Sequence, residues 1–543
     1  MRIIQWQAAT TAGAHTVTGT KESLASSVVS EPLLRYLTDA TIIPNLVKEV
    51  PSVENGLLAE DLSTVTFNLL EGITWSDGEP FTANDVVFTW QWVITPENAS
   101  TSFALWDVLE NVEAQDDLTV VATYKRPSVA WFEAFTSAPA GCIYPAHVFN
   151  NDPANKNDAF LVNPIGTGPY VIESFQPNAE IVYVVNENYR EPNKPFFARV
   201  VVTGGGDAAA AARAVLVTGE AQFAWNMQVE PAILEEMQAS GGQGTIVTEP
   251  GTSIERININ FSDPNTEVEG QRSHVGTPHP ILSDLKVRQA LNLAVPREVI
   301  STEFYGEGQP PTANILAGVP SLESPNTSWE FNLEAAGALL DEAGWVMEGD
   351  VRVKDGRELT LSYATSINQV RQKTQAVVQQ AFQQLGVRVQ LQQIDAGVFF
   401  DGSAGNTQNI NHFYWDIDEY ANSSIGSPVP VNYTVGFYAG PEDTLSNIAQ
   451  QENDWQTDNY WRYQSDEYDA LYEELLAATE IEAATALLIE MNDIVINDVV
   501  VIPLVNRAGG NYAIANTLNQ ENIAAGPSFE PDYWNIANWN NVQ

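Results

Sequence analysis

The chain has 543 residues and a mass of 59.4 kDa, which at ordinary domain sizes predicts roughly three to four domains. Hydrophobic residues make up 44% of the sequence and aromatic residues 10%, enough for large cores, so a disordered or fibrous chain is excluded. Acidic residues outnumber basic ones 70 to 24, and the net charge of −46 argues against binding to nucleic acids or anionic membranes, because both require clustered Lys and Arg.

The acidic residues are scattered along the chain rather than gathered in runs. A surface of this kind repels its own copies at low salt and stays soluble at ordinary salt. Two interpretations are open: the protein works in saline surroundings, or its charge attracts cationic ligands. The even spread of the acids favours the first, a halophilic adaptation.

Signals for disulfides, membrane spans and export are missing from the sequence. Cys142 is the only cysteine, so we expect neither an intrachain disulfide nor a cysteine metal site. No apolar run approaches the ~20 residues of a membrane-spanning helix. The segment from Met1 to Gln7 lacks the basic region and apolar core of an export signal, and we therefore expect that any such signal has been removed.

The first half of the chain alternates strand-like and helix-like patterns, which is typical of an α/β protein. Residues 64–70 predict a strand, and Thr82 with Asp85 has the capping-box spacing that begins a helix. The apolar run 181–185 predicts a buried strand. The alanine-rich run 207–217 predicts a helix.

The second half continues this alternation. Ser283 and Asn332 each precede an amphipathic run, and we expect them to cap two helices. Residues 369–385 have the best helical pattern of the chain, and the alternation at 387–392 predicts a half-buried strand after it. Residues 466–498 predict two further helices, followed by an apolar strand.

Sequence motifs of common enzymes are missing. There is no P-loop, no G-x-S-x-G, no H-E-x-x-H and no G-x-G-x-x-G after a strand, and none of the five histidines forms an i, i+4 pair. Asp416, Asp418 and Glu419 resemble the start of a calcium loop, but the glycine and the distal glutamate of such a loop are missing. We therefore expect no metal, no cofactor and no catalytic group, and predict a protein that is not an enzyme.

The sequence contains fourteen tryptophans. Most are expected in cores, because the indole ring buries a large apolar surface. A minority lining a cleft would suit peptide side chains or sugar rings. Trp75, Trp415 and Trp461 are the candidates for this role.

Four segments, in the same order along the chain, together resemble a known family. They are LLEGITWSDGEPFTANDVVFTW (69–90), the P-x-G-T-G-P-Y block with the strands after it (163–202), LKVRQALNLAVPREVI (285–300) and NLEAAGALLDEAGW (332–345). All four are similar to stretches of the solute-binding proteins of ABC importers, in the family that takes up oligopeptides, dipeptides, nickel and some oligosaccharides.

The resemblance implies an α/β fold of the periplasmic-binding-protein kind (type II, the large class with an extra domain), in which two lobes close about a hinge on a ligand. Lobe I is expected in three pieces, at 1–32, 160–257 and 505–543. The extra, accessory domain is expected at 33–159 and lobe II at 258–504. Such a protein breaks no bond, which agrees with the missing enzyme motifs.

The resemblance also implies a ligand site in lobe II. Peptide binders of the family hold the α-ammonium of the ligand with the aspartate of a W-x-x-D segment, and Trp415 and Asp418 match this spacing, with Asp416 between them. The residues from Glu419 to Asn422 depart from the usual D/N-x-P continuation. The alternative is that Asp418 is one of the 70 acids and lies on a solvated loop.

Capture of peptides is therefore the first hypothesis, and capture of oligosaccharides, with tryptophans stacked on sugar rings, is its alternative. A peptide site needs a carboxylate for the N-terminus of the ligand and often a base for its C-terminus. The candidate bases near lobe II are few, namely Arg371, Arg388 and Arg462.

Two further alternatives remain open, an acidic extracellular glycoside hydrolase and a sensor that docks on a receptor after binding its ligand. For the importer component we expect a monomer with an ABC permease as its membrane partner. Its expected place is outside the cytoplasm, either periplasmic or anchored by lipid at the outer face of the cell membrane.

Overall fold

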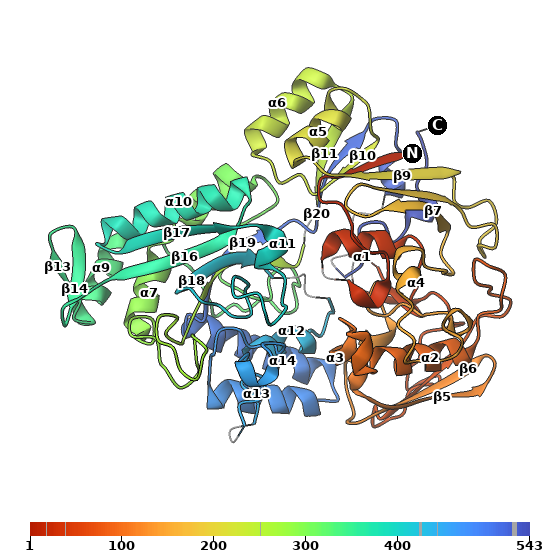
Figure 1. The fold of residues 1–543 in the computed structure, drawn as a ribbon, viewed down its shortest axis with the longest axis horizontal. Coiled ribbons are helices and arrows are strands. Elements are labelled where there is room, and N and C mark those ends of the chain that lie inside the picture. Colours follow the sequence, from red (N-terminus) through yellow and green to blue (C-terminus); the bar gives the residue numbers. More distant parts are fainter. Residues whose placement is uncertain are drawn as a thin grey trace.

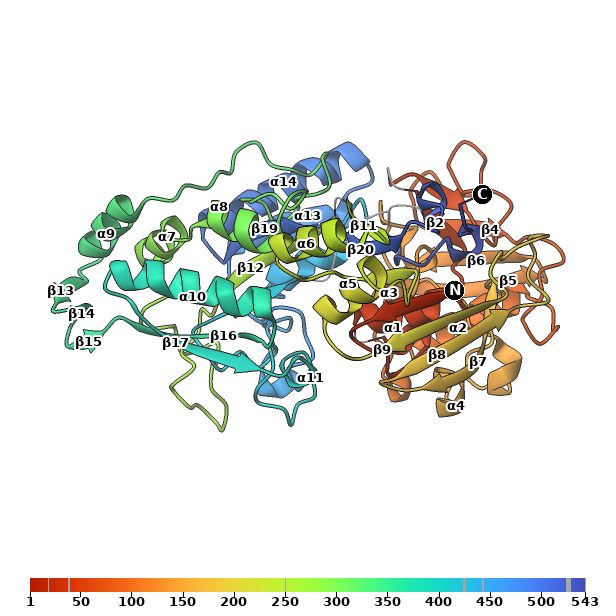
Figure 2. The ribbon, with the colours of Figure 1, turned by 90° about the horizontal axis from the view of Figure 1, so that it is seen from above.

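The computed structural model describes residues 1–17, 19–37, 40–249, 251–422, 426–441, 444–523 and 529–542. Within these residues, the main sheets have seven strands, five strands and, for β4-β6-β5, three strands. Figure 1 shows the five-stranded sheet on one side of the molecule and the other two on the opposite side. The view from above gives the same division, so the chain has a two-lobed α/β fold (Figure 2).

The seven-stranded sheet unites distant parts of the chain, in the order β11-β20-β10-β1-β9-β8-β7. Its strands are β1 (Arg2–Gln5), β7 (Tyr170–Gln176), β8 (Glu180–Val185), β9 (Arg199–Gly204), β10 (Phe223–Trp225), β11 (Gly244–Glu249) and β20 (Gly510–Ala515). The central strand β1 pairs in parallel with β9 and β10, whereas β20 is antiparallel to both of its neighbours. The predicted strand at 181–185 is confirmed as β8.

Helices cover both faces of this sheet. Helices α5 (Ala208–Leu216) and α6 (Pro231–Gly241) share a core with the side chains of one face, and α1 (Thr20–Ser27) shares another core with those of the opposite face. The end of α1 explains the glycines of the P-x-G-T-G-P-Y block. A Cβ atom on Gly166 would lie 1.9 Å from the carbonyl oxygen of Val29, so no larger residue fits there.

The three-stranded antiparallel sheet belongs to the region between β1 and β7. It consists of β4 (Thr64–Asn68), β6 (Thr119–Tyr124) and β5 (Leu109–Asp116), with α2 (Ala83–Val93) packed on it. The predicted capping box is confirmed, because Asp85 accepts a hydrogen bond of 2.8 Å from the backbone N–H of Thr82. The remaining elements of this region are β2 (Leu34–Tyr36), β3 (Ile42–Pro44), α3 (Phe103–Asp107) and α4 (Asp158–Val162).

The five-stranded sheet has the order β17-β16-β18-β12-β19. Its strands are β12 (Ser253–Ile259), β16 (Thr360–Ser366), β17 (Arg388–Ile394), β18 (Ile417–Ala421) and β19 (Val501–Arg507). Strand β16 is parallel to β17 and β18, and β12 is antiparallel to β18 and β19. The predicted helix and strand at 369–392 are confirmed as α10 and β17.

The two faces of this sheet differ. One face shares an aliphatic core with three helices, α7, α9 and α10, whereas the other meets a largely aromatic layer that includes α12. The helices of this part are α7 (Leu285–Leu293), α8 (Arg297–Ile300), α9 (Leu333–Glu342), α10 (Gln369–Gln384), α11 (Ala396–Phe399), α12 (Val431–Thr434), α13 (Asp466–Ala477) and α14 (Ile481–Asn497). A hairpin sheet of β13 (Val346–Glu348), β14 (Val351–Lys354) and β15 (Arg357–Glu358) lies at its outer end (Figure 1).

The two predicted caps of this part have different outcomes. Asn332 caps α9 as predicted, through a hydrogen bond of 3.0 Å from the backbone N–H of Ala335. The predicted cap of α7 is wrong, because Asp284 takes that role. The hydroxyl of Ser283 donates instead to the carbonyl oxygen of His279, at 2.6 Å.

Two connections join the lobes, from β11 to β12 and from β19 to β20. They lie against each other, since a Cβ atom on Gly251 would come within 2.1 Å of the backbone nitrogen of Gly509. The predicted domain boundaries at 257 and 504 fall inside β12 and β19, and the division into domains stays a prediction. None of the helices in the described part of the chain is both long enough and apolar enough to span a membrane.

Candidate functional site

The candidate site lies on the aromatic face of the five-stranded sheet, where β12 and β18 pair. In the register of this pair, Asn258 is opposite Asp418 and Arg256 is opposite Tyr420. Because side chains alternate along a strand, these four side chains belong to one face. The intervening Ile257 belongs to the aliphatic core on the other face.

Asp418 is fully buried in this arrangement. One carboxylate oxygen accepts a hydrogen bond from the indole N–H of Trp415 at 2.9 Å, and the other accepts from the side-chain amide of Asn258 at 2.8 Å. Burial raises the pKa of Asp418 to about 7, although both hydrogen bonds and the charge of Arg256 act to lower it. The alternative of a solvated loop is therefore wrong for Asp418.

Trp461 joins the same chain of hydrogen bonds. Its indole N–H donates to the side-chain oxygen of Asn258 at 3.1 Å, so Asn258 links it to Asp418. Trp415 and Trp461 are both buried, and each stacks on a phenylalanine, with ring centroids 5.5 Å and 4.7 Å apart. The structure thus brings together three of the candidate residues, Asp418, Trp415 and Trp461.

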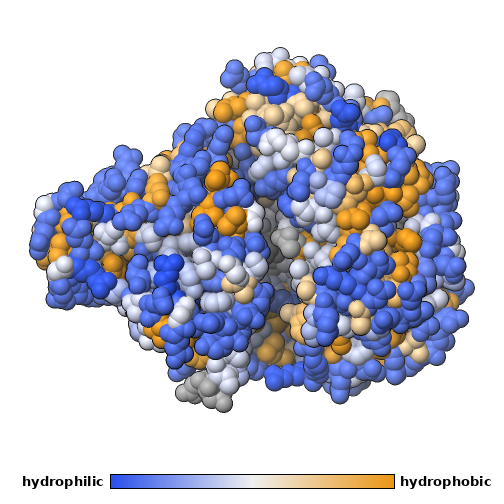
Figure 3. All heavy atoms as spheres, in the orientation of Figure 1, coloured by the Kyte–Doolittle hydropathy of each residue, from blue (hydrophilic) through white to orange (hydrophobic). Residues whose placement is uncertain are grey.

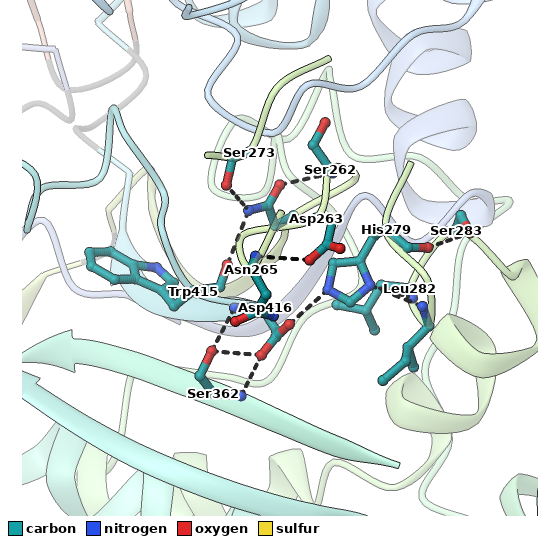
Figure 4. A network of polar contacts seen from close by, with 12 residues as sticks. Ser262, Asp263, Asn265, Ser273, His279, Leu282, Ser283, Ser362, Trp415 and Asp416 are labelled. Carbon is teal, nitrogen blue, oxygen red and sulfur yellow. Dashed lines mark hydrogen bonds and ion pairs between the residues drawn. The ribbon is translucent and has the colours of Figure 1, made fainter. Parts of the chain in front are cut away.

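Asp416 lies next to Trp415, and both of its carboxylate oxygens are bound by other residues of the protein (Figure 4). One oxygen pairs with His279 Nε2 at 2.8 Å, and the other accepts from the backbone N–H and the hydroxyl of Ser362, both at 2.6 Å. Burial acts to raise the pKa of Asp416, but these partners lower it overall. Asp416 therefore ties strand β16 to the loop that contains His279.

The serine, histidine and aspartate of this network do not form a nucleophilic triad. The hydroxyl of Ser362 donates to Asp416 rather than to His279. The other ring nitrogen of His279, Nδ1, accepts from the backbone N–H of Leu282 at 2.9 Å, as Figure 4 shows. No hydrogen bond among the described residues links this serine to the histidine, as activation of the hydroxyl would require.

Trp75 lies in another part of the molecule, next to the capping box of α2. Its indole N–H donates to Asp85 at 3.4 Å, its ring meets Phe81 edge-on, and its side chain is buried. These described contacts are all local, and they do not bring Trp75 to Asp418. A role for Trp75 in ligand binding stays a prediction.

The candidate bases all have protein partners. Arg371 pairs with Glu255 at 2.7 Å, and Arg388 lies on the surface with two carboxylates. Arg462 is buried and donates to backbone carbonyl oxygens, including that of Ser273 at 3.1 Å. Polar residues of β12 that sequence reasoning missed, Arg256 and Asn258, are the ones that adjoin Asp418. Their signal was the alternation at the end of the strand SIERINI, where Arg256 and Asn258 flank Ile257 and therefore belong to the opposite face.

A groove separates the two lobes, as the space-filling view shows (Figure 3). Contacts across it come from α12 and α13 on one side and from the 33–159 region on the other. The side-chain amide of Asn432 donates to Glu133 at 2.8 Å, and Arg126 pairs with Glu473 at 3.3 Å. Desolvation raises the pKa of Glu133 to about 8. Helix α12, which covers the aromatic face beside Arg256, thus also forms a wall of the groove.

Among the described residues, no group of three or more His, Cys, Asp or Glu side chains is placed to hold a metal ion. The candidate site offers instead a buried carboxylate, a guanidinium and several aromatic rings at the edge of a groove. This combination suits an organic ligand that carries charge.

Comparison with known proteins places this geometry in a family. The curated relatives include the nickel-binding periplasmic protein of Escherichia coli, 25% identical over 68% of this chain and 66% of that protein. They also include the oligopeptide-binding protein AppA of Bacillus subtilis, 26% identical over 76% of this chain and 71% of AppA. The solved structure of AppA in complex with a nonapeptide has a TM-score of 0.79 at 20% identity and covers 100% of this chain and 99% of the other.

The extent of the matches differs between the comparisons. The chain spans only 50% to 66% of the length of the first three curated relatives that it matches. The profile described as "Bacterial extracellular solute-binding proteins, family 5 Middle" matches residues 41–444, which is most of the chain. The chain therefore belongs to the family 5 bacterial extracellular solute-binding proteins.

Proposed function

We propose that this protein captures peptides between its two lobes and delivers them to an ABC permease in the membrane. Membership of a family of solute-binding proteins, rather than enzymes, supports the binding role. The relative from Bacillus subtilis is named an oligopeptide-binding protein, and the AppA structure that this chain resembles contains a nonapeptide. Both findings favour a peptide as the ligand.

The observation that carries this proposal is the carboxylate of Asp418. A carboxylate offers about four lone-pair positions, and only two donors among the described residues occupy them. The α-ammonium of a peptide can donate to the remaining positions. Such charge-assisted hydrogen bonds contribute about 1.5–3 kcal/mol in total, enough to fix the N-terminal end of the ligand.

The oligosaccharide alternative is less well supported. Its tryptophans, Trp415 and Trp461, have their N–H groups directed to Asp418 and Asn258, and each has a ring face against a phenylalanine. Stacking on a sugar would have to use the remaining faces. A glycoside hydrolase has even less support, because the family consists of binding proteins.

Closure of the lobes is part of the proposal. The two adjacent connections, β11 to β12 and β19 to β20, are where a hinge would form. A ligand between the lobes contacts both of them, so it favours the closed form by its difference in affinity for the two forms. For the domains we keep lobe I at 1–32, 160–257 and 505–543, the accessory domain at 33–159 and lobe II at 258–504.

The cellular setting follows from the importer role. We place the protein outside the cytoplasm, as a monomer that meets its permease in the closed form, either free or anchored by lipid. A monomer suits a cleft that must open and close. The acidic surface then faces the outside medium, where a saline habitat would account for it.

Two measurements test the proposed function. Native mass spectrometry of the purified protein should show a ladder of peptide masses, whereas hexose masses or a metal would contradict peptide capture. Calorimetry with a series of peptides of two to nine residues should then show binding that falls at least about tenfold in Asp418→Asn. The matched control is Asp350→Asn, because Asp350 is an exposed acid paired with Arg388. Equal affinity of the Asp418→Asn variant and the wild type would remove Asp418 from the site.

A further inference from the structure

Arg256 is a buried cation enclosed by aromatic rings. Its side chain is almost fully buried, on strand β12 between β18 and β19. Four rings of the described residues surround the guanidinium carbon at 5.2 to 6.0 Å from their centroids; they belong to Tyr420, Tyr433, Phe437 and Trp461. Aromatic faces stabilise a cation but accept few of its hydrogen bonds.

The hydrogen-bonding capacity of this guanidinium is incompletely used. One terminal nitrogen donates to the hydroxyl of Tyr433 at 2.7 Å, and the hydroxyl of Tyr420 also lies within reach. Among the described residues, the Nε–H has no partner and no carboxylate lies within 4.0 Å of the guanidinium. A guanidinium has five N–H donors, so a buried arginine without an acid retains donors for a further acceptor.

Other buried arginines of the chain are satisfied in different ways. Arg371 has Glu255, and Arg462 donates to several backbone carbonyl oxygens. Arg297 likewise donates to carbonyl oxygens, including that of Pro503 at 2.6 Å. Arg256 therefore stands apart among them, because its guanidinium is in direct contact with rings and hydroxyls but with no carboxylate or carbonyl oxygen in the described part of the chain. An unpaired buried charge is costly, which indicates that its partner arrives from outside.

Arg256 lies next to the residue assigned to the ligand ammonium. Arg256 and Asp418 are diagonal neighbours across the β12 and β18 pair, a relation that places Cα atoms about 7–8 Å apart. Their charges interact, since Arg256 acts to lower the pKa of Asp418. One residue of an extended peptide spans at most about 3.3–3.6 Å, so a ligand held at Asp418 reaches Arg256 with its first or second residue.

We propose that Arg256 is a specificity-determining residue that binds a carboxylate carried by the first or second residue of the ligand. This inference rests on the proposed function, in which Asp418 holds the α-ammonium. The planar guanidinium matches a carboxylate in a two-point contact. The carboxylate has two possible sources, the side chain of Asp or Glu or the C-terminus of a dipeptide. The preferred ligands are therefore peptides that are zwitterionic at their N-terminal end.

Helix α12, which covers Arg256, lies beside the groove through which a ligand would approach. Tyr433, which bonds to Arg256, belongs to α12, and the neighbouring Asn432 contacts Glu133 across the groove. Opening of the groove breaks the contact between Asn432 and Glu133. It thereby removes a contact that holds α12, the element covering the guanidinium, against the opposite lobe.

Calorimetry on the intact protein with matched peptide amides tests the proposal. The side-chain arm compares Ala-Glu-Ala-Ala-NH2 with its Gln counterpart, and Asp-Ala-Ala-Ala-NH2 with its Asn counterpart. The C-terminal arm compares Ala-Ala with Ala-Ala-NH2. We expect the acidic member of at least one pair to bind at least about tenfold more tightly, and the arm in which this occurs identifies the source of the carboxylate. Measurement at about 0.5 M NaCl reduces the general repulsion of acidic peptides by the charged surface.

Variants distinguish a direct contact between Arg256 and the ligand carboxylate from an effect of the overall charge of the protein. Arg256→Gln should remove the preference for the acid while still binding the amide peptides. The matched control Arg388→Gln deletes an exposed arginine with the same change of charge and should keep the preference. Arg256→Lys should retain only part of it, because an ammonium cannot make the two-point contact. The circular dichroism spectra of these variants report whether they are folded.

The outcomes distinguish this inference from the proposed function. Wild-type protein that binds acid and amide peptides equally well overturns the role of Arg256, yet leaves peptide capture intact. The same holds if Arg256→Gln is folded and keeps the preference. Wild-type protein that binds none of the peptides overturns both. The comparison on the wild type needs no variant, so a misfolded Arg256→Gln does not prevent a decision.

Discussion

Binding of a cationic ligand at Asp418 should release protons, because this acid is partly protonated before the ligand arrives. Burial raises its pKa to about 7. The protonated fraction in the free protein is then about 0.9 at pH 6, 0.5 at pH 7 and 0.1 at pH 8. An ammonium at hydrogen-bond distance favours the ionised form and lowers the pKa well below this range. The α-amino group of the free peptide, with a pKa of about 8, takes up almost no proton at pH 6 and about 0.1 at pH 7. We therefore expect a net release of about 0.9 proton per peptide bound at pH 6 and about 0.4 at pH 7.

The same linkage predicts how affinity depends on pH. The protonated form of Asp418 must lose its proton before it pairs with the ammonium. The apparent association constant is therefore the constant for ionised Asp418 multiplied by the fraction of free protein in which Asp418 is ionised. That fraction rises about fivefold between pH 6 and pH 7, and the affinity should rise with it. Above about pH 8 the α-amino group of the peptide itself loses its charge, and the affinity should fall again.

Calorimetry in buffers of different ionisation enthalpy measures this release directly. At each pH, the slope of the observed heat against the ionisation enthalpy of the buffer gives the number of protons exchanged. The variant Asp418→Asn should show no release at pH 6 from this source, and its residual affinity should be flat from pH 6 to pH 8. Release of protons by this variant equal to that of the wild type, or no release by the wild type at pH 6, would refute the reasoning.

Three further predictions concern the surroundings of the site and the fold. Asn432→Asp places a second carboxylate beside Glu133, whose pKa is already raised to about 8, so peptide affinity should be about tenfold below that of the wild type at pH 8 and approach the wild-type value towards pH 5; a ratio of the two affinities that does not change with pH in calorimetry would contradict this. Ser362→Ala removes a hydroxyl from Asp416 and should lower stability in thermal unfolding by about 1–3 kcal/mol with unchanged peptide affinity, whereas lost affinity would place Asp416 at the ligand. Gly166→Ala should lower the melting temperature by several degrees, because the new Cβ would lie 1.9 Å from a backbone oxygen, and an unchanged melting temperature would show that the backbone adjusts freely.

Local signals made much of the fold predictable. The capping boxes and caps at Thr82 and Asn332, and the helix that begins after Asn368, depend on hydrogen bonds between neighbouring residues, so the sequence alone contains them. The prediction that Ser283 caps α7 was wrong because the next residue, Asp284, is an equally good cap. The hydroxyl of Ser283 instead donates to the carbonyl oxygen of His279 in a loop. Competition of this kind depends on tertiary contacts that no local pattern records.

The candidate site was only partly predictable for the same reason. Trp415 and Asp418 are three positions apart and share a recognisable spacing. Asn258 and Arg256 meet them only through the register of β12 and β18, whose paired residues are about 160 positions apart in the sequence, as the hydrogen bond from Asn258 to Asp418 shows. A shift of one residue in that register would turn both side chains to the aliphatic face. Contacts across the groove, such as that of Glu133, depend in addition on how the lobes meet.

The net charge of −46 is calculated with all 70 acidic side chains ionised. In the structure, the protonation of these side chains depends on how deeply each one is buried. Exposed acids such as Asp61 and Asp116 have pKa values lowered by nearby hydrogen bonds, so they stay ionised at neutral pH. Desolvation raises the pKa values of Asp418 and Glu133 to about 7 and about 8, so these two acids are partly protonated at neutral pH. Salt screens exposed charges strongly and buried pairs weakly. Ionic strength should therefore govern the solubility of this protein far more than the contact between a bound ammonium and Asp418, and a saline medium leaves that contact nearly intact.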